Sequence, residues 1–207
     1  MRTDHVHGPI RPRVTLEDPD EPLEMIGFTI ARYKFACKWL RETDRVLEVG
    51  CGAGFGANFL SRHSARVVAI DSDAEAIAAC RGRYRRENIE FVAADLLSPS
   101  FAPPWSFDAV VCLEVIEHMD RSSGEALARC MRDLLAPGGI LLLSTPRARS
   151  DRSLSRQRHH PYEYSHDALR GTLDPLFARV MVFCQNDELI YAGHPSTAWN
   201  FVAVAFR

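Results

Sequence analysis

The sequence lacks long apolar runs. No stretch in its 207 residues approaches the roughly 20 apolar residues that a membrane-spanning helix requires. The first seven residues, Met1 to His7, also lack the apolar centre of a signal peptide. We therefore expect no membrane segment and a cytoplasmic location.

Paired cysteines are missing as well. The six cysteines stand singly, and no two form a C-x-x-C motif, which argues against a zinc knuckle. Several lie inside apolar stretches, so we expect buried, reduced thiols. The cysteines are Cys37, Cys51, Cys80, Cys112, Cys130 and Cys184.

Neither sign of charge is in large excess. The chain has 25 basic and 27 acidic residues and a formal net charge of −2. This balance argues against an extended basic surface for nucleic acid and against a disordered acidic tail. The length and the 46% apolar content suit one globular domain.

The amino-acid composition changes after the first 22 residues. Four prolines there disfavour a regular helix, so we expect an arm or lid over residues 1–22 and a single domain over residues 23–207. Between Glu24 and Arg41, apolar residues recur at helical spacing and predict one or two helices.

Short apolar runs then alternate with stretches long enough for a helix, which predicts an α/β fold with a doubly wound, mostly parallel sheet. Two final runs are joined only by a loop, so we expect an antiparallel edge. The predicted strands are 46–49, 67–70, 89–92, 107–112, 140–143, 180–183 and 201–206.

A glycine-rich loop, Gly50–Gly56, follows the first predicted strand directly. Glycine lets the backbone turn sharply and approach a ligand at the start of the next helix. The loop predicts a nucleotide-like ligand, although Gly52, Gly54 and Ala57 also match the dinucleotide fingerprint G-x-G-x-x-A.

Three acids narrow the choice of ligand. Glu48 precedes the loop, and Asp71 and Asp95 come at or just after the ends of the next two strands, so all three should face one crevice. Asp71 is placed to accept hydrogen bonds from ribose hydroxyls, and Asp95 from an adenine amino group. Glu48 would repel phosphates but tolerate a sulfonium and an ammonium, which favours S-adenosylmethionine.

Five motifs in order resemble those of the class I S-adenosylmethionine-dependent methyltransferases. They are Val46–Gly54, Val68–Asp71, Ala94–Leu96, Phe107–Val111 and Leu134–Gly139. The resemblance implies a seven-stranded sheet whose last strand is antiparallel. Glu48 departs mildly from the aspartate that is usual in the family.

The resemblance also implies a set of cofactor-binding residues. Three glycines would lie near the methionine part, Asp71 at the ribose, and Asp95 with Leu96 at the adenine. Cys112 and Leu113 would line the other side. The full expected set is Glu48, Gly50, Cys51, Gly52, Gly54, Asp71, Ser72, Asp95, Leu96, Cys112 and Leu113.

A cluster of acids and histidines predicts a catalytic or metal-binding site. If a helix begins after the fourth strand, Glu114, Glu117 and His118 lie on one face, and a later loop adds His159, His160 and His166. Carboxylates and imidazoles together suit Mg²⁺, Mn²⁺, Fe²⁺ or Zn²⁺.

Similarity to small-RNA 3′-terminal ribose 2′-O-methyltransferases implies metal ligands at Glu114, Glu117, His118 and His160. Without a metal, His118 or His160 would act as the base, because an ordinary imidazole pKa near 6.5 suits proton abstraction at neutral pH. The expected catalytic residues are His118, His160 and Glu117.

The segments Ala31–Ala36 and Leu176–Val180 look more like small-molecule methyltransferases, including ubiquinone-pathway and glycosyltransferase-associated enzymes. We therefore predict O-methylation of a hydroxylated small molecule: a sugar, polyketide or phenolic metabolite. The alternatives are 2′-O-methylation at an RNA 3′ end, N-methylation of an amino sugar or peptide amine, and a non-catalytic cofactor-binding subunit. The sequence leaves the oligomeric state open.

Overall fold

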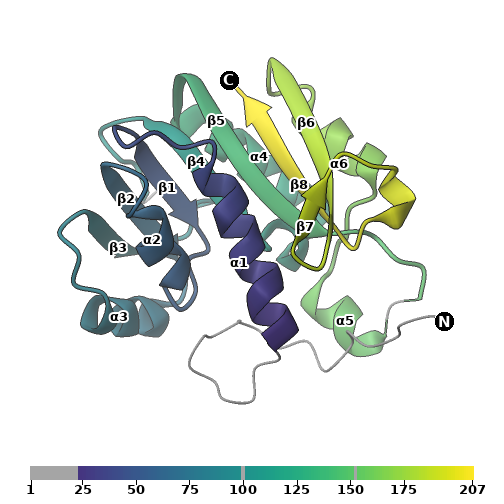
Figure 1. Cartoon of the computed structure of the whole chain (residues 1–207), viewed down its shortest axis with the longest axis horizontal. Coiled ribbons are helices and arrows are strands. Elements are labelled where there is room, and N and C mark those ends of the chain that lie inside the picture. The colour runs from purple at the N-terminus through teal and green to yellow at the C-terminus, as the bar shows by residue number, and fades with distance from the viewer. Residues whose placement is uncertain (1–22, 99–100, 152) are drawn as a thin grey trace.

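The computed structural model describes residues 23–98, 101–151 and 153–207, so the expected arm at 1–22 lies outside the described residues. One eight-stranded sheet crosses the molecule in the order β3-β2-β1-β4-β5-β8-β6-β7 (Figure 1). The strands are β1 (Arg45–Val49), β2 (Arg66–Asp71), β3 (Ile89–Ala93), β4 (Phe107–Leu113), β5 (Leu135–Pro146), β6 (Arg179–Asn186), β7 (Leu189–Tyr191) and β8 (Asn200–Phe206).

The sheet confirms the expected α/β class. The first five strands pair in parallel, and the last strand, β8, is antiparallel to both β5 and β6. The expected number of seven strands is wrong by one. The additional strand, β7, pairs with the end of β6 across a tight turn at Asp187, whose φ is 47°.

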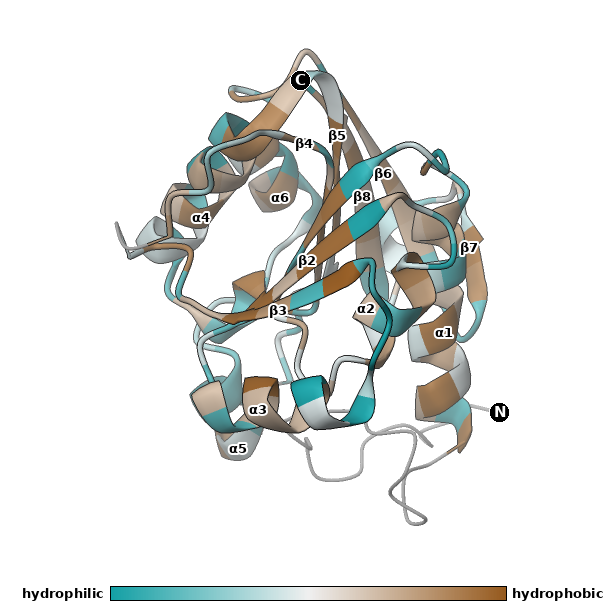
Figure 2. Ribbon diagram, turned by 90° about the vertical axis from the view of Figure 1, so that its left-hand side faces the viewer, coloured by the Kyte–Doolittle hydropathy of each residue, from teal (hydrophilic) through white to brown (hydrophobic). Residues whose placement is uncertain are grey.

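Helices cover both faces of the sheet. On one face lie α1 (Leu23–Cys37), α2 (Phe55–Leu60) and α3 (Ala74–Arg83), and on the other lie α4 (Arg121–Leu134) and α6 (His166–Leu173) (Figure 2). Successive strand residues point to opposite faces, so Val46 packs with α1 and α2 while Leu47 packs toward α4. A short helix, α5 (Leu154–His159), has no buried residue.

The strand order reverses between β1 and β4. From β1 the chain moves outward to β2 and β3, and it then returns to place β4 on the other side of β1. In open α/β sheets a crevice forms at such a switch point, outside the carboxyl ends of the strands. The 3₁₀ helices η1 (Ile116–His118), next to this crevice, and η2 (Pro195–Thr197) complete the described elements.

Among the described helices, none has the length and apolar character that would let it cross a membrane.

Candidate functional site

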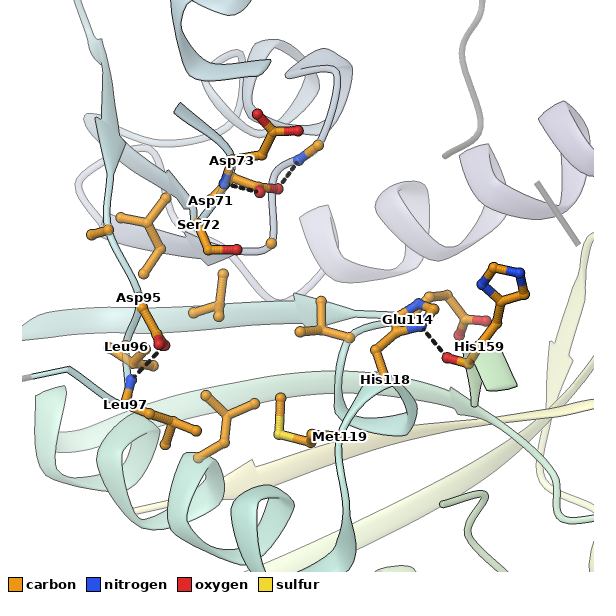
Figure 3. Close-up of a pocket in the computed structure, with 17 residues that line it drawn as sticks. Asp71, Ser72, Asp73, Asp95, Leu96, Leu97, Glu114, His118, Met119 and His159 are labelled. Atoms are coloured by element: carbon orange, nitrogen blue, oxygen red, sulfur yellow. Dashed lines mark hydrogen bonds between the residues drawn. The ribbon is translucent and has the colours of Figure 1, made fainter. Parts of the chain in front are cut away.

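A cavity of about 670 Å³ lies at this switch point. Its walls come from the glycine loop, from the ends of β2 and β3, and from the segment after β4 (Figure 3). Acidic side chains mark one end, and Glu114, His118 and His159 lie at the other.

The glycine loop reaches the cavity because its backbone adopts left-handed angles. Gly50, Gly52 and Gly54 have φ values of 75°, 52° and 79°, which side chains other than glycine rarely adopt. A Cβ atom on Gly50 would also overlap Val115. The glycines therefore allow the loop to pack against the segment after β4 and to expose backbone toward the cavity.

Asp71 ties the glycine loop to the end of β2. One carboxylate oxygen accepts a hydrogen bond from the Gly52 amide at 2.8 Å, and the other accepts from the Asp73 amide at 3.0 Å (Figure 3). Asp95 lines the same end and accepts from the Leu97 amide at 2.9 Å. Two ordered carboxylates thus present oxygens where a ligand with hydroxyl or amino groups would meet them.

Glu48 lies beneath the loop and not in the cavity wall. The Tyr33 hydroxyl donates to one of its oxygens at 2.8 Å, and the second oxygen has no hydrogen-bond partner among the described residues. Burial raises the pKa of Glu48 to about 8; the Tyr33 hydrogen bond opposes this rise and the charge of Asp71 adds to it.

The second cluster reaches the other end of the cavity through His118, whereas Glu117 and His160 are buried and do not line the cavity. One ligand atom from each of Glu117, His118 and His160 lies within 4.8 Å of the other two. The His118 and His160 rings are 5.0 Å apart at an angle of 76°. Glu117 is 1% exposed and accepts a hydrogen bond from the Thr145 hydroxyl at 3.1 Å.

Hydrogen bonds orient both imidazoles of this cluster. His118 Nδ1 lies 2.8 Å from the His159 carbonyl oxygen, which can only accept, so Nδ1 carries the proton (Figure 3). His160 Nδ1 lies 3.2 Å from a carboxylate oxygen of Glu163. In the neutral state, the His118 ring then carries its lone pair on Nε2.

Burial changes the ionisation of the cluster. It lowers the pKa of His118, although the hydrogen bond to the His159 carbonyl acts in the opposite direction. Burial also raises the pKa of Glu117 well above its usual value, and the charge of Glu114 adds to that rise. A neutral imidazole thus lies beside a buried carboxyl group whose charged form is disfavoured.

The expected helical arrangement of Glu114, Glu117 and His118 is wrong. Glu114 has a left-handed φ of 57°, and the helical turn begins only at Ile116. The Glu114 carboxylate accepts hydrogen bonds from the Ser144 hydroxyl and the Asn200 amide, each at 2.7 Å. The structure therefore lines the cavity with Glu114 but does not bring it into the three-residue group.

Comparison with known proteins shows similarity to methyltransferases. Residues 46–139 match the family model described as "Methyltransferase domain". A ubiquinone biosynthesis O-methyltransferase of Xanthomonas campestris is 38% identical over 138 residues, which are 62% of this chain and 54% of that protein. These similarities support a class I S-adenosylmethionine-dependent methyltransferase.

Two further proteins show the same similarity to methyltransferases. A probable S-adenosylmethionine-dependent methyltransferase of Mycolicibacterium smegmatis is 39% identical over 101 residues, 49% of this chain and 37% of that protein. The crystal structure of the N-methyltransferase NodS from Bradyrhizobium japonicum has a TM-score of 0.65 at 25% identity and covers 91% of this chain and 98% of its own. The chain spans about a third to a half of the length of the two curated relatives.

The cavity contains several of the residues expected to bind S-adenosylmethionine. Six of the predicted cofactor residues line it: Gly50, Gly52, Asp71, Ser72, Asp95 and Leu96. NodS has been crystallised in complex with S-adenosylhomocysteine.

The remaining expected residues do not line the cavity. Cys112 is fully buried and packs in the core with α4, because alternation along β4 turns its side chain away. The other absent residues are Glu48, Cys51, Gly54 and Leu113.

Sequence reasoning missed several residues that form much of the apolar wall. Val115 and Met119 flank η1, and Leu127 reaches the cavity from α4. Their position after the fourth motif was a signal that could have found them. The loop geometry that orients their side chains leaves no periodic pattern in the sequence, so it could not be predicted. Asp73 and Leu97, which also line the cavity at its acidic end, were missed as well.

Proposed function

We propose that this chain is an O-methyltransferase that transfers a methyl group from S-adenosylmethionine to a hydroxylated small molecule, such as a sugar, polyketide or phenolic metabolite. The similarity to a ubiquinone biosynthesis O-methyltransferase supports this acceptor class. When bound, S-adenosylmethionine supplies a methyl group that is electrophilic because it sits on a sulfonium.

One observation carries the proposal. His118 lines the cavity opposite Asp71 and Asp95, and its Nδ1 proton is held by the His159 carbonyl (Figure 3). The ring therefore has a fixed orientation and carries its lone pair on Nε2. It lies at the end of the cavity away from Asp71 and Asp95, the acids proposed to bind adenosine. This is the arrangement that a general base for an acceptor hydroxyl requires.

The proposed role of His118 is proton removal. The acceptor hydroxyl gives its proton to Nε2 as its oxygen gains the methyl group, and S-adenosylhomocysteine remains. The lowered pKa keeps the imidazole neutral and ready to accept this proton at neutral pH. His160 stands edge-to-face with His118 and packs against this base from outside the cavity lining.

The same residues suit a divalent cation. Glu117, His118 and His160 would hold it, because one ligand atom from each lies within 4.8 Å of the other two and the carboxylate–imidazole set suits such a cation. Mg²⁺, Mn²⁺, Fe²⁺ or Zn²⁺ would supply Lewis acidity that lowers the pKa of an acceptor hydroxyl.

A Mn²⁺ titration followed by electron paramagnetic resonance tests the metal. With S-adenosylhomocysteine present, we expect saturable binding in the wild type and its loss in Glu117→Ala and His160→Ala. His166→Ala is the matched control, because His166 contacts Asp167 instead of the cluster. No binding by the wild type would refute the Mn²⁺-type metal and leave His118 as a metal-independent base.

A panel of acceptors tests the methylated atom. We expect methyl transfer to catechols or sugar diols and none to primary amines. N-methylation of an amino sugar or peptide amine is the second candidate, favoured by the similarity to NodS along nearly all of that chain. Transfer to amines alone would refute O-methylation, and salt-sensitive transfer to RNA 3′ ends would place the acceptor in another class.

A further inference from the structure

The segment that closes the histidine end of the cavity contains a buried acid that the proposed reaction does not use. Glu163 is 6% exposed, although it follows α5, a helix without a buried residue. Burying a carboxylate is unfavourable unless it is paired and hydrogen-bonded. The groups that contact the Glu163 carboxylate therefore indicate its role.

At least three groups contact the Glu163 carboxylate. The Arg156 guanidinium from α5 contacts Oε1 at 2.5 Å, and the Arg149 amide donates to Oε2 at 3.3 Å. His160 Nδ1 lies 3.2 Å from Oε1. The guanidinium and the amide can only donate, so in these contacts the two oxygens of Glu163 act as acceptors.

We propose that Glu163 is a positioning residue that holds His160 in the tautomer with its proton on Nδ1 and its lone pair on Nε2. The inference rests on the proposed function, in which His160 stands beside the base or binds a metal. Carboxylate partners of this kind fix both the tautomer and the ring orientation of histidines in active sites and metal sites.

The same segment orients the second histidine. His159, the last residue of α5, offers its carbonyl oxygen to His118 Nδ1 at 2.8 Å. Arg156 lies one turn earlier on this helix and ties it to Glu163. The two imidazoles thus take their Nδ1 partners from one short segment, within which Arg156 and Glu163 form an ion pair.

Nitrogen NMR tests the proposal directly on the wild type. The protein is labelled with ¹⁵N-histidine and saturated with S-adenosylhomocysteine. Long-range ¹H–¹⁵N spectra are recorded at a pH well above the ordinary imidazole pKa of about 6.5, where both rings are neutral. His118→Gln and His160→Gln spectra assign the two rings. We expect both to be Nδ1-protonated; an Nε2-protonated His160 would overturn the proposal, whether or not any Glu163 variant folds.

Glu163→Gln removes the charge at nearly constant shape. We expect His160 to lose its single tautomer while His118 keeps its own. Asp151→Asn is the matched control, because Asp151 belongs to the same segment but pairs with the exposed Arg149 side chain. An unchanged His160 tautomer in a folded Glu163→Gln variant would overturn the role of Glu163.

Metal affinity gives a second readout. If the wild type binds Mn²⁺, Glu163→Gln should weaken binding by about 10- to 100-fold, the usual cost of losing a partner behind a metal-ligating histidine. Equal affinity in wild type and Glu163→Gln would contradict the proposal. Absence of Mn²⁺ binding by the wild type would refute only the metal of the proposed function, since the tautomer is measured without it.

Discussion

The two ends of the cavity are built in different ways. At the end of the cavity that holds Asp71 and Asp95, called the adenosine end after the proposed ligand, each of these acids accepts a hydrogen bond from the amide two residues later. The parallel register of β1, β2 and β3 brings the two acids together. At the histidine end, Glu117 and His118 meet His160 from a segment about 40 residues later in the chain. Local backbone forms one end, whereas tertiary packing forms the other.

Each end also contains a buried glutamate, and their partners differ. Glu48 has the Tyr33 hydroxyl and an unpaired oxygen, while Glu117 has the Thr145 hydroxyl and two nearby imidazoles. Both have raised pKa values because of burial. Neither glutamate lines the cavity, but Glu117 directly precedes His118, which does.

The largest effect should come from Glu48→Gln. The pKa of Glu48 is raised from 4.5 to about 8, so its contribution to stability is fully present below pH 4.5 and is lost as the pH rises through 8. This loss amounts to roughly 5 kcal/mol of unfolding free energy at full ionisation. Urea unfolding across this range should show a flatter pH dependence for Glu48→Gln than for wild type, and parallel curves would contradict the assignment.

His118→Asn should be the next largest change. Removing the base should lower methyl transfer about a thousandfold, roughly 4 kcal/mol in activation free energy, and leave the affinity for S-adenosylhomocysteine unchanged. The wild-type rate should fall only below the ordinary imidazole pKa of about 6.5, because burial lowers the pKa of His118. His166→Asn serves as the control, and a full rate in His118→Asn would exclude this histidine as the base.

Asp71→Asn tests the adenosine end. The amide keeps one accepting oxygen but loses the charge and one of the two backbone contacts, so affinity for S-adenosylhomocysteine should fall about thirtyfold, or roughly 2 kcal/mol. Titration calorimetry measures the affinity of each variant for S-adenosylhomocysteine. Asp108→Asn is the matched control, because Asp108 also accepts a backbone hydrogen bond, from Arg45, but at the start of β4. Equal losses in both variants would argue against a ligand contact at Asp71.

The adenosine end could be predicted because its signals are local. A glycine loop directly after a strand and an acid at a strand end need only the parallel order of the sheet to converge. Cys112 shows the limit of this reasoning, since it directly follows the fourth motif but strand alternation directs its side chain into the core.

The histidine end could be predicted only in part. The residue types of Glu117, His118 and His160 suggested a cluster, but Glu114 adopts a backbone angle that a residue with a side chain rarely takes, and no pattern signals it. The missed strand β7 had a signal in the turn-forming pair Asn186-Asp187.

The smallest effect concerns Tyr164, one residue after Glu163. Its hydroxyl is buried and has no hydrogen-bond partner among the described residues. Removing an unsatisfied buried hydroxyl should cost nothing and should stabilise the protein by about 1 kcal/mol. Thermal unfolding of Tyr164→Phe should therefore show an equal or higher midpoint, with unchanged ¹⁵N signals of His160. Destabilisation by Tyr164→Phe would mean that a bound water or ligand satisfies this hydroxyl, and that the histidine end extends further into the protein than its three-residue group.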